Sequence, residues 1–395
     1  MLHNGKIAVA MVEPIGGHSG NDFYDFGLCK ALAEQGARLV FYTCDETTLD
    51  QRFAFPFATE KPFRRIYGTD PKWLRGMRYV LGSWRTVTHA VRNRLQLAHL
   101  HIYHFASREL LNLLLFRMRG FRIVATIHDV ENFETYGQQP KHSHHGAFMS
   151  RLDRIIVHSD YARQSVLRHF KGYPPDRIHV VPHGDADFLF KRPLLPQEAR
   201  RQLHLPLDAR IVLFFGQIKK VKGLDVLLNA WAIVRQRNPR AHLVVVGRPW
   251  KVEQEIFDRI VREKQLESSC TFNYAYIPNE DIPVYYAAAD LVVLPYREIY
   301  SSGVMVRSLD YGAAIVASDL SAFRNIITDN DNGLLFRNED AVHLAERILE
   351  VLDDDVRLQQ LRERAHQTAE QRFSWNQIGS QVMEVYHKAL HERQS

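Results

Sequence analysis

Short runs of apolar residues alternate along the chain with longer segments in which apolar residues recur every three or four positions. Residues 6–12 form an apolar run that is typical of a buried parallel strand. Residues 26–35 have helical spacing and end at Gly36, a residue type that often follows a helix. Residues 38–43 return to the strand pattern. The chain therefore opens with a predicted β-α-β unit.

The same alternation continues in both halves of the chain. In the first half, further strands are predicted at residues 99–104, 122–127, 154–158 and 178–181. A linker richer in Pro, Arg and Gln follows at residues 191–204. The pattern then restarts, with strands predicted at residues 210–215, 242–246, 269–274, 290–294, 314–317 and 334–336.

This repetition predicts an α/β protein with two Rossmann-like, doubly wound domains. We expect an N-terminal domain over residues 1–190 and a C-terminal domain over residues 191–372. The last helical segment, residues 373–395, is expected to pack back on the N-terminal domain. Because open α/β sheets bind ligands beyond the carboxyl ends of their strands, we predict a binding cleft between the two domains.

Composition narrows the class of protein. A length of 395 residues suits two domains, and 46% apolar with 24% charged residues is ordinary for a globular protein. Cys29, Cys44 and Cys270 are scattered and lack CxxC spacing, which predicts free thiols in a reducing compartment. No secretory signal pattern and no run of about eighteen apolar residues is present. We expect a cytoplasmic protein.

The positive charge is concentrated in residues 51–95, which hold ten basic and two acidic residues, a net charge of +8. Aromatic residues are interleaved with the basic ones. Such a composition suits an anionic membrane surface and, less well, a nucleic acid. The alternative is a solvated helix whose aromatic side chains reach the core. We predict a peripheral membrane contact at the inner face and no nucleic-acid partner.

Three glycine-containing loops are candidates for binding a diphosphate, which needs backbone amides and cations. They are Gly16-Gly17, residues 216–223 with Lys219, Lys220 and Lys222, and residues 298–304 with Ser301, Ser302 and Gly303. Each alone is also explained as an ordinary turn. A dinucleotide GxGxxG, a P-loop and a GxSxG elbow are absent from the sequence, which argues against NAD-linked enzymes, P-loop kinases and serine hydrolases.

Longer motifs carry a resemblance to a known family. The second half contains "FFGQIKKVKGLDVLLNAW", "LVVVGRP", "NYAYIPNEDIPVYYAAADLVVLPYREIYSSG" and "YGAAIVASDLSAFRNIITDNDNGLLF". The first half adds "IGGHSG", "TIHD", "IIVHSDYARQSV" and "IHVVPHG". In this order the motifs resemble GT-B fold glycosyltransferases of the family 4 type (glycosyl transferases group 1). The resemblance implies sugar transfer from a nucleoside-diphosphate sugar to a saccharide or lipid-linked saccharide, in surface polysaccharide or glycolipid biosynthesis, without a metal or another cofactor.

The resemblance also implies roles for individual residues. Those assigned to the donor phosphates are Gly16, Gly17, Lys222, Ser301, Ser302, Gly303 and Val304, with Gln217 where an arginine is usual and Lys219 supplying the missing charge. Tyr276 and Ile277 are expected to line the base, and His128 and Glu298 to lie at the transferred sugar.

The sequence departs from the family pattern at Arg307, which replaces a ribose-binding glutamate; Asp310 lies nearby. The stereochemical outcome stays open. An inverting reaction needs a carboxylate base, for which Asp129 and Glu131 are candidates, whereas a retaining reaction, which we favour, needs none. The alternatives to a transferase are a nucleotide-sugar epimerase or hydrolase and a non-catalytic binding subunit. The histidines in residues 141–145 lack the spacing of a known zinc site.

Overall fold

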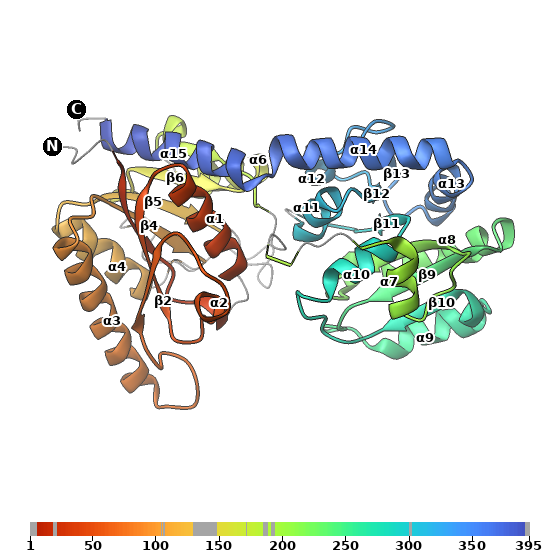
Figure 1. Cartoon of the computed structure of the whole chain (residues 1–395), viewed down its shortest axis with the longest axis horizontal. Coiled ribbons are helices and arrows are strands. Elements are labelled where there is room, and N and C mark those ends of the chain that lie inside the picture. Colours follow the sequence, from red (N-terminus) through yellow and green to blue (C-terminus); the bar gives the residue numbers. More distant parts are fainter. Residues whose placement is uncertain are drawn as a thin grey trace. The chain divides into compact units, whose positions relative to one another are not determined.

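The computed structural model divides the chain into two compact units, Met1–Gly184 with Ser374–Ser395, and Asp185–Phe373 (Figure 1). We describe each unit by itself. The structure describes residues 6–18, 22–103, 105, 107–128, 148–170, 172–184, 189–190, 194–299 and 302–391. Among these residues, none of the helices combines the length and apolar composition that a bilayer crossing needs.

The first unit is built on a parallel sheet in the order β3-β2-β1-β4-β5-β6-β7. Its strands are β1 (Ala8–Val12), β2 (Arg38–Cys44), β3 (Ala58–Phe63), β4 (Leu97–Ile102), β5 (Arg122–Ile127), β6 (Arg154–Val157) and β7 (Ile178–Val180). All residues of β1 are buried, because both faces of the sheet are covered. The order reverses between β1 and β4, which places the topological switch point at their carboxyl ends.

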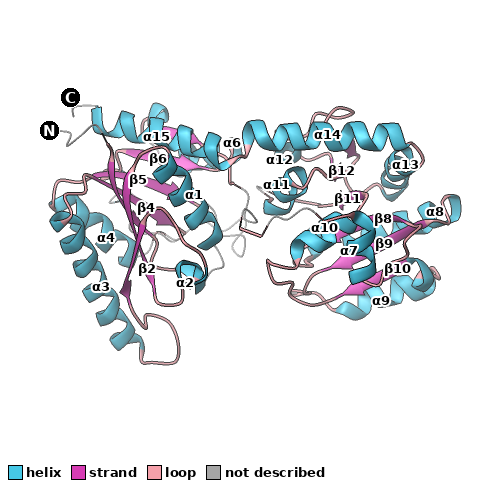
Figure 2. Cartoon of the chain, in the orientation of Figure 1, coloured by secondary structure: helices cyan, strands magenta, loops and turns pink. Residues whose placement is uncertain are grey.

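Helices cover the sheet of the first unit (Figure 2). They are α1 (Asp22–Glu34), α2 (Leu49–Arg52), α3 (Lys72–Arg92), α4 (Ser107–Met118), α6 (Asp160–His169) and α15 (Trp375–His391), with short 3-10 turns η1 (Gly16–His18) and η3 (Pro175–Arg177). The predicted helix at residues 26–35 is the later part of α1.

The C-terminal helix α15 belongs to the first unit, where it packs on α1 and β5 (Figure 1). Gly27 of α1 has no room for a side chain because the Trp375 indole lies against its backbone. The Gln35 side-chain amide donates to the Asn376 carbonyl at 2.7 Å. Tyr386 is fully buried and its hydroxyl lies 2.6 Å from His99 Nδ1.

The second unit repeats the design with a parallel sheet in the order β10-β9-β8-β11-β12-β13. Its strands are β8 (Arg210–Phe215), β9 (Ala241–Val246), β10 (Cys270–Asn273), β11 (Leu291–Leu294), β12 (Ala314–Ser318) and β13 (Leu334–Phe336). The helices around it are α7 (Pro196–Gln202), α8 (Leu224–Arg237), α9 (Gln254–Glu263), α10 (Ile282–Ala288), α11 (Gly303–Asp310), α12 (Ser321–Arg324), α13 (Ala341–Leu352) and α14 (Asp355–Arg372), with η4 (Lys220–Lys222) and η5 (Glu267–Ser269). Here the switch point lies between β8 and β11.

Two differences from the sequence-based elements have clear causes. Strand β3 was not predicted, because its sequence ATEKPF is polar and contains Pro62; an edge strand tolerates both. The segment predicted as a linker, residues 191–204, contains helix α7, which begins at Pro196, a residue suited to a first helical turn.

Candidate functional site

The loop after β8 has a fixed backbone at the switch point of the second unit. Ile218 donates its N–H to the Arg248 carbonyl at 3.0 Å, and Trp250 donates to the Ile218 carbonyl at 2.9 Å. Gly247 has a φ of +144°, and a side chain there would overlap the Gly216 carbonyl. The glycine therefore lets two loop backbones pack directly together.

The end of the basic loop is joined to the segment that follows β11. Gly223 has a φ of +65°, and its α-carbon lies so close to the Pro295 carbonyl that no side chain fits. Arg297 donates its backbone N–H to Val221 and its guanidinium to the Lys220 carbonyl at 2.9 Å. The same guanidinium binds Asp225 at 2.6 and 2.8 Å. These bonds fix Lys222, the last residue of η4.

Lys222 is half-buried against an aromatic ring. Its Nζ lies 3.6 Å from the centroid of the Tyr296 ring, which is fully buried. In the described part of the chain, no carboxylate forms an ion pair with Lys222. Burial therefore lowers the pKa of Lys222 to about 7. Its surroundings favour a negatively charged ligand, which would restore the protonated form.

Tyr296 connects this lysine to the start of helix α11, because its ring contacts Lys222 Nζ and its hydroxyl interacts with the side chain of Ser302, the N-cap of α11. The Ser302 hydroxyl accepts from the Met305 N–H at 3.2 Å and caps the helix. The Gly303 and Val304 amides precede the first intrahelical donors, and among the described residues they have no acceptor. A β-carbon added at Gly303 would have no heavy atom of the described residues within 4 Å, apart from its chain neighbours and its own helix.

The Val304 side chain closes the site on the side of Gly216. A β-carbon added to Gly216 would lie 3.1 Å from Val304 Cγ2. The structure thus brings together the loop after β8, Lys222 and the first turn of α11. A positive helix end beside an uncompensated lysine is the arrangement that binds phosphate.

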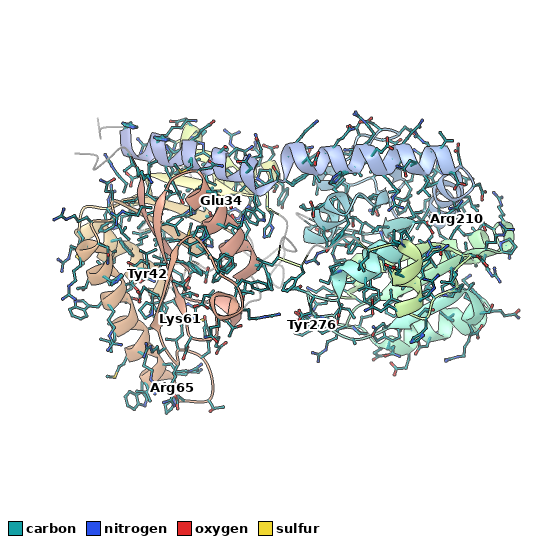
Figure 3. All side chains as sticks on the ribbon, in the orientation of Figure 1. Glu34, Tyr42, Lys61, Arg65, Arg210 and Tyr276 are labelled. Atoms are coloured by element: carbon teal, nitrogen blue, oxygen red, sulfur yellow. The ribbon has the colours of Figure 1, made fainter. Side chains whose placement is uncertain are left out.

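The remaining residues assigned to the donor follow strands β8, β10 and β11 of the second unit or lie outside the described residues. Gln217 is exposed, and Lys219 precedes η4 and is half-buried. Tyr276 is 73% exposed on the segment after β10 (Figure 3), and Ile277 beside it is half-buried. Glu298 is exposed before α11. Their roles stay predictions. Ser301, Asp129, Glu131 and residues 141–145 lie outside the described residues.

In the first unit, the Gly16-Gly17 loop packs tightly after β1. Gly16 has a φ of +48°, and a side chain there would overlap the hydroxyls of Thr43 and Thr47. Gly17 donates its N–H to Thr47 Oγ1 at 3.1 Å. Glu13 Oε1 accepts from the amides of Ile15 and Gly16 at 2.6 and 3.2 Å. Close backbone packing explains both glycines, and their contact with a diphosphate stays a prediction.

His128 follows β5 and belongs to a chain of hydrogen bonds. His158 Nδ1 lies 3.0 Å from the Val181 carbonyl, which only accepts, so this nitrogen carries the proton. His158 Nε2 therefore accepts from His128 Nδ1 at 3.3 Å. His128 Nε2 is then an acceptor, and it is buried without a hydrogen-bond partner among the described residues. The chain fixes the tautomer of a histidine expected at the sugar.

Aromatic contacts hold His128 in place. Its ring stacks on Tyr103, with centroids 4.3 Å apart, and meets Tyr24 edge-on at 5.4 Å. Burial, then the neighbouring His158, lowers the pKa of His128 well below its usual range. Sequence reasoning missed His158 and Tyr24, because the pairing of β5 with β6 brings His158 to His128 and the packing of helix α1 brings Tyr24.

Two family models match the chain in sequence. The model described as "Glycosyltransferase Family 4" matches residues 26–185, and the one described as "Glycosyl transferases group 1" matches residues 196–372. The chain belongs to the GT-B glycosyltransferases of group 1. The loop after β8 and helix α11 lie within the second match, and His128 lies within the first.

Individual relatives agree with this assignment. This group 1 glycosyltransferase is 29% identical over 248 residues to the D-inositol 3-phosphate glycosyltransferase of Corynebacterium aurimucosum, a stretch that covers 61% of this chain and 58% of the relative. In fold it is similar to a glycosyltransferase of Rickettsia africae (TM-score 0.77, 16% identity, 98% of this chain and 100% of the other). It is also similar to Anabaena HepE solved with UDP (TM-score 0.74, 18% identity, 96% of this chain and 100% of the other).

Proposed function

We propose that this chain transfers a sugar from a nucleoside-diphosphate sugar to an acceptor, and that the second unit binds the donor diphosphate. The observation that carries this proposal is the half-buried Lys222, without a carboxylate partner in the described residues, which Tyr296 links to the first turn of α11. A diphosphate satisfies both the lysine and the Gly303 and Val304 amides.

The same groups serve the reaction. As the bond from the sugar to the diphosphate breaks, negative charge grows on the leaving phosphate. Lys222 and the two amides are fixed before the reaction, so they stabilise this charge without reorganising. Removing one such donor typically costs about 3 kcal/mol of transition-state stabilisation. No carboxylate base is needed if the leaving phosphate takes the acceptor proton, which is the retaining reaction that we favour.

The sugar is proposed to lie at His128, whose Nε2 accepts a hydrogen bond from a sugar hydroxyl. Uridine diphosphate is the first donor nucleotide to test, because Anabaena HepE binds UDP and has the same fold. Gly17, Gln217, Lys219, Tyr276 and Glu298 keep their predicted donor roles. The base, the sugar and the linkage are to be found by experiment.

A donor screen tests the proposal. Purified protein is incubated with UDP-, GDP- and dTDP-sugars, and release of the nucleoside diphosphate is followed with and without saccharide acceptors. The proposal expects release that depends on an acceptor and that Lys222→Met lowers by about 100-fold or more, whereas Lys220→Met, at an exposed neighbour, retains it. An epimerase would yield an isomerised donor, and a hydrolase would release the sugar to water. A non-catalytic subunit would bind a donor without turnover.

The acceptor side of the proposal rests on helix α3. Its exposed apolar side chains recur with helical spacing and form one face, made of Trp73, Met77, Val80, Leu81 and Trp84. The opposite face, with Tyr79, Gly82 and Thr86, is buried in the unit. Exposed Lys72, Arg85 and Arg92 flank the apolar face. Packing in the core accounts for the aromatic residues Phe63 and Tyr79, which are buried. It does not account for Trp73 and Trp84, which are exposed.

We propose that this face of α3 rests on anionic lipid and brings the enzyme to a lipid-linked saccharide at the inner face of a membrane. Sedimentation with vesicles of phosphatidylcholine and phosphatidylglycerol tests this. Binding at low salt that the double substitution Trp73→Ser, Trp84→Ser removes would support the proposal. Equal sedimentation of wild type and variant, or none of either, would refute it.

A further inference from the structure

Three ionisable side chains meet beneath the Gly16 loop of the first unit. Glu13 follows β1, Asp25 lies on α1 and His101 lies on β4, so the cluster sits at the switch point of this sheet. His101 Nδ1 lies 2.8 Å from Asp25 Oδ1 and 3.8 Å from Glu13 Oε2. The three atoms all lie within 4.8 Å of one another. None of the three side chains is exposed to solvent.

The polar atoms of this cluster lack hydrogen bonds. Among the described residues, Glu13 Oε2, both carboxyl oxygens of Asp25 and both ring nitrogens of His101 have no hydrogen-bond partner. Within the same residues, the ion pairs of Glu13 and Asp25 involve His101 and no lysine or arginine. Two buried carboxylates without a cation are costly, so either they are protonated or a cation joins them.

Hydrogen bonds among uncharged forms of these three side chains account for little of their arrangement. A protonated Asp25 could face His101 Nδ1 and explain the 2.8 Å separation. It would leave Glu13 Oε2 and the second Asp25 oxygen unpaired. Burial raises the pKa of Glu13 to about 8 and lowers the pKa of His101 to about 4, which shows how strongly the site disfavours uncompensated charge. A bound cation would satisfy one lone pair of each residue at once.

We propose that Glu13 Oε2, Asp25 Oδ1 and His101 Nδ1 bind a divalent transition-metal ion, Zn²⁺ or Mn²⁺. One imidazole and two carboxylates suit these ions. Ligand atoms about 2.1 Å from a tetrahedral ion are about 3.4 Å apart, a value between the two separations from His101 Nδ1. The three residues belong to the first unit, whereas Lys222 and α11 belong to the second, so this proposal does not rest on the proposed donor site.

The bound ion would also hold the Gly16 loop in place, through Glu13. The second oxygen of the same carboxylate, Glu13 Oε1, accepts from the amides of Ile15 and Gly16. Binding Glu13 on one side therefore fixes the loop on the other, as outer-shell bonds do at metal sites. The sequence predicted no metal because residues 13, 25 and 101 share no motif; only the pairing of β1 with β4 and the packing of α1 bring them together.

Metal content of the full-length protein tests the site. Protein is stripped with EDTA, loaded with Zn²⁺ or Mn²⁺, dialysed and measured by mass spectrometry. Wild type and the control Asp22→Asn, which changes a carboxylate of α1 outside the cluster, are expected to retain about one equivalent. Asp25→Asn and His101→Gln are expected to retain under about a tenth of that. No retained ion in wild type, or equal retention in Asp25→Asn, would overturn the proposal.

X-ray absorption spectroscopy of the metal-loaded wild-type protein identifies the ligand atoms of the ion without the use of a variant. The site predicts one nitrogen and two or more oxygen ligands at about 2.0–2.2 Å and no sulfur ligand. A spectrum with sulfur, or with water oxygens only, would place the ion elsewhere and overturn the proposal even if the variants fail to fold.

Discussion

Replacing Lys222 by methionine separates a functional lysine from a structural one. Methionine keeps the length of the side chain and removes its charge. If Lys222 stabilises the leaving diphosphate, the loss of about 3 kcal/mol should lower kcat/KM by about 100-fold or more with the donor that the screen selects. The Lys220→Met control, at an exposed neighbour, should change it little.

The Lys222→Met variant should lose activity but gain stability against unfolding. Lowering the pKa of Lys222 from 10.5 to about 7 corresponds to a burial cost of about 5 kcal/mol, at about 1.4 kcal/mol per pH unit. The contact with Tyr296 that methionine loses is worth about 1–2 kcal/mol. The burial cost is larger, so the ligand-free variant should be more stable than wild type by about 3–4 kcal/mol.

The pH dependence of this gain follows from the direction of the shift. The unfolded lysine still binds its proton between pH 7 and 10.5, where the folded one has released it. The stability of wild type therefore rises with pH across this window. The gain from Lys222→Met should be full below about pH 7 and small near about pH 10.

Urea denaturation of wild type, Lys222→Met and Lys220→Met at about pH 6 and pH 10 measures the effect. A variant that loses both stability and activity would mark Lys222 as a structural residue and refute the reasoning. So would a variant that keeps the kcat/KM of wild type.

Three further predictions follow from other parts of the structure. Binding of UDP should take up protons near about pH 8, because the diphosphate raises the pKa of Lys222 again; calorimetry in buffers of different ionisation enthalpy measures this, and no difference between buffers would contradict it. Gly223→Ala should destabilise the protein by about 1 kcal/mol or more, because of its positive φ and the nearby Pro295 carbonyl, whereas Gly76→Ala, with open space around it, should not; equal melting temperatures of the two variants would contradict this. His158→Phe should release the fixed tautomer of His128, seen as a change in its ring ¹⁵N shifts, and unchanged shifts would refute the hydrogen-bond chain.

The elements that sequence patterns predict best are those buried on both faces. Strands β1 and β11 are continuous apolar runs, so burial alone fixes them. Strand β3 escaped prediction because an edge position tolerates Lys61 and Pro62. Its ion pair between Lys61 and Asp50 depends on a neighbouring segment that the local pattern does not identify (Figure 3).

Some features of the candidate site could likewise be predicted from the sequence, and others could not. Lys222 and Ser302 were predictable because each lies in a loop whose own residues suit a phosphate. Burial of Lys222 on Tyr296 was not, since it needs the pairing of β8 with β11. The cluster of Glu13, Asp25 and His101 depends on contacts between distant segments, which no spacing along the chain reveals.

A crystal structure with UDP tests the central proposal most directly. The account predicts a diphosphate oxygen within about 3.2 Å of Lys222 Nζ and others within the same distance of the Gly303 and Val304 amides. Diphosphate density away from Lys222 and α11 would contradict the account.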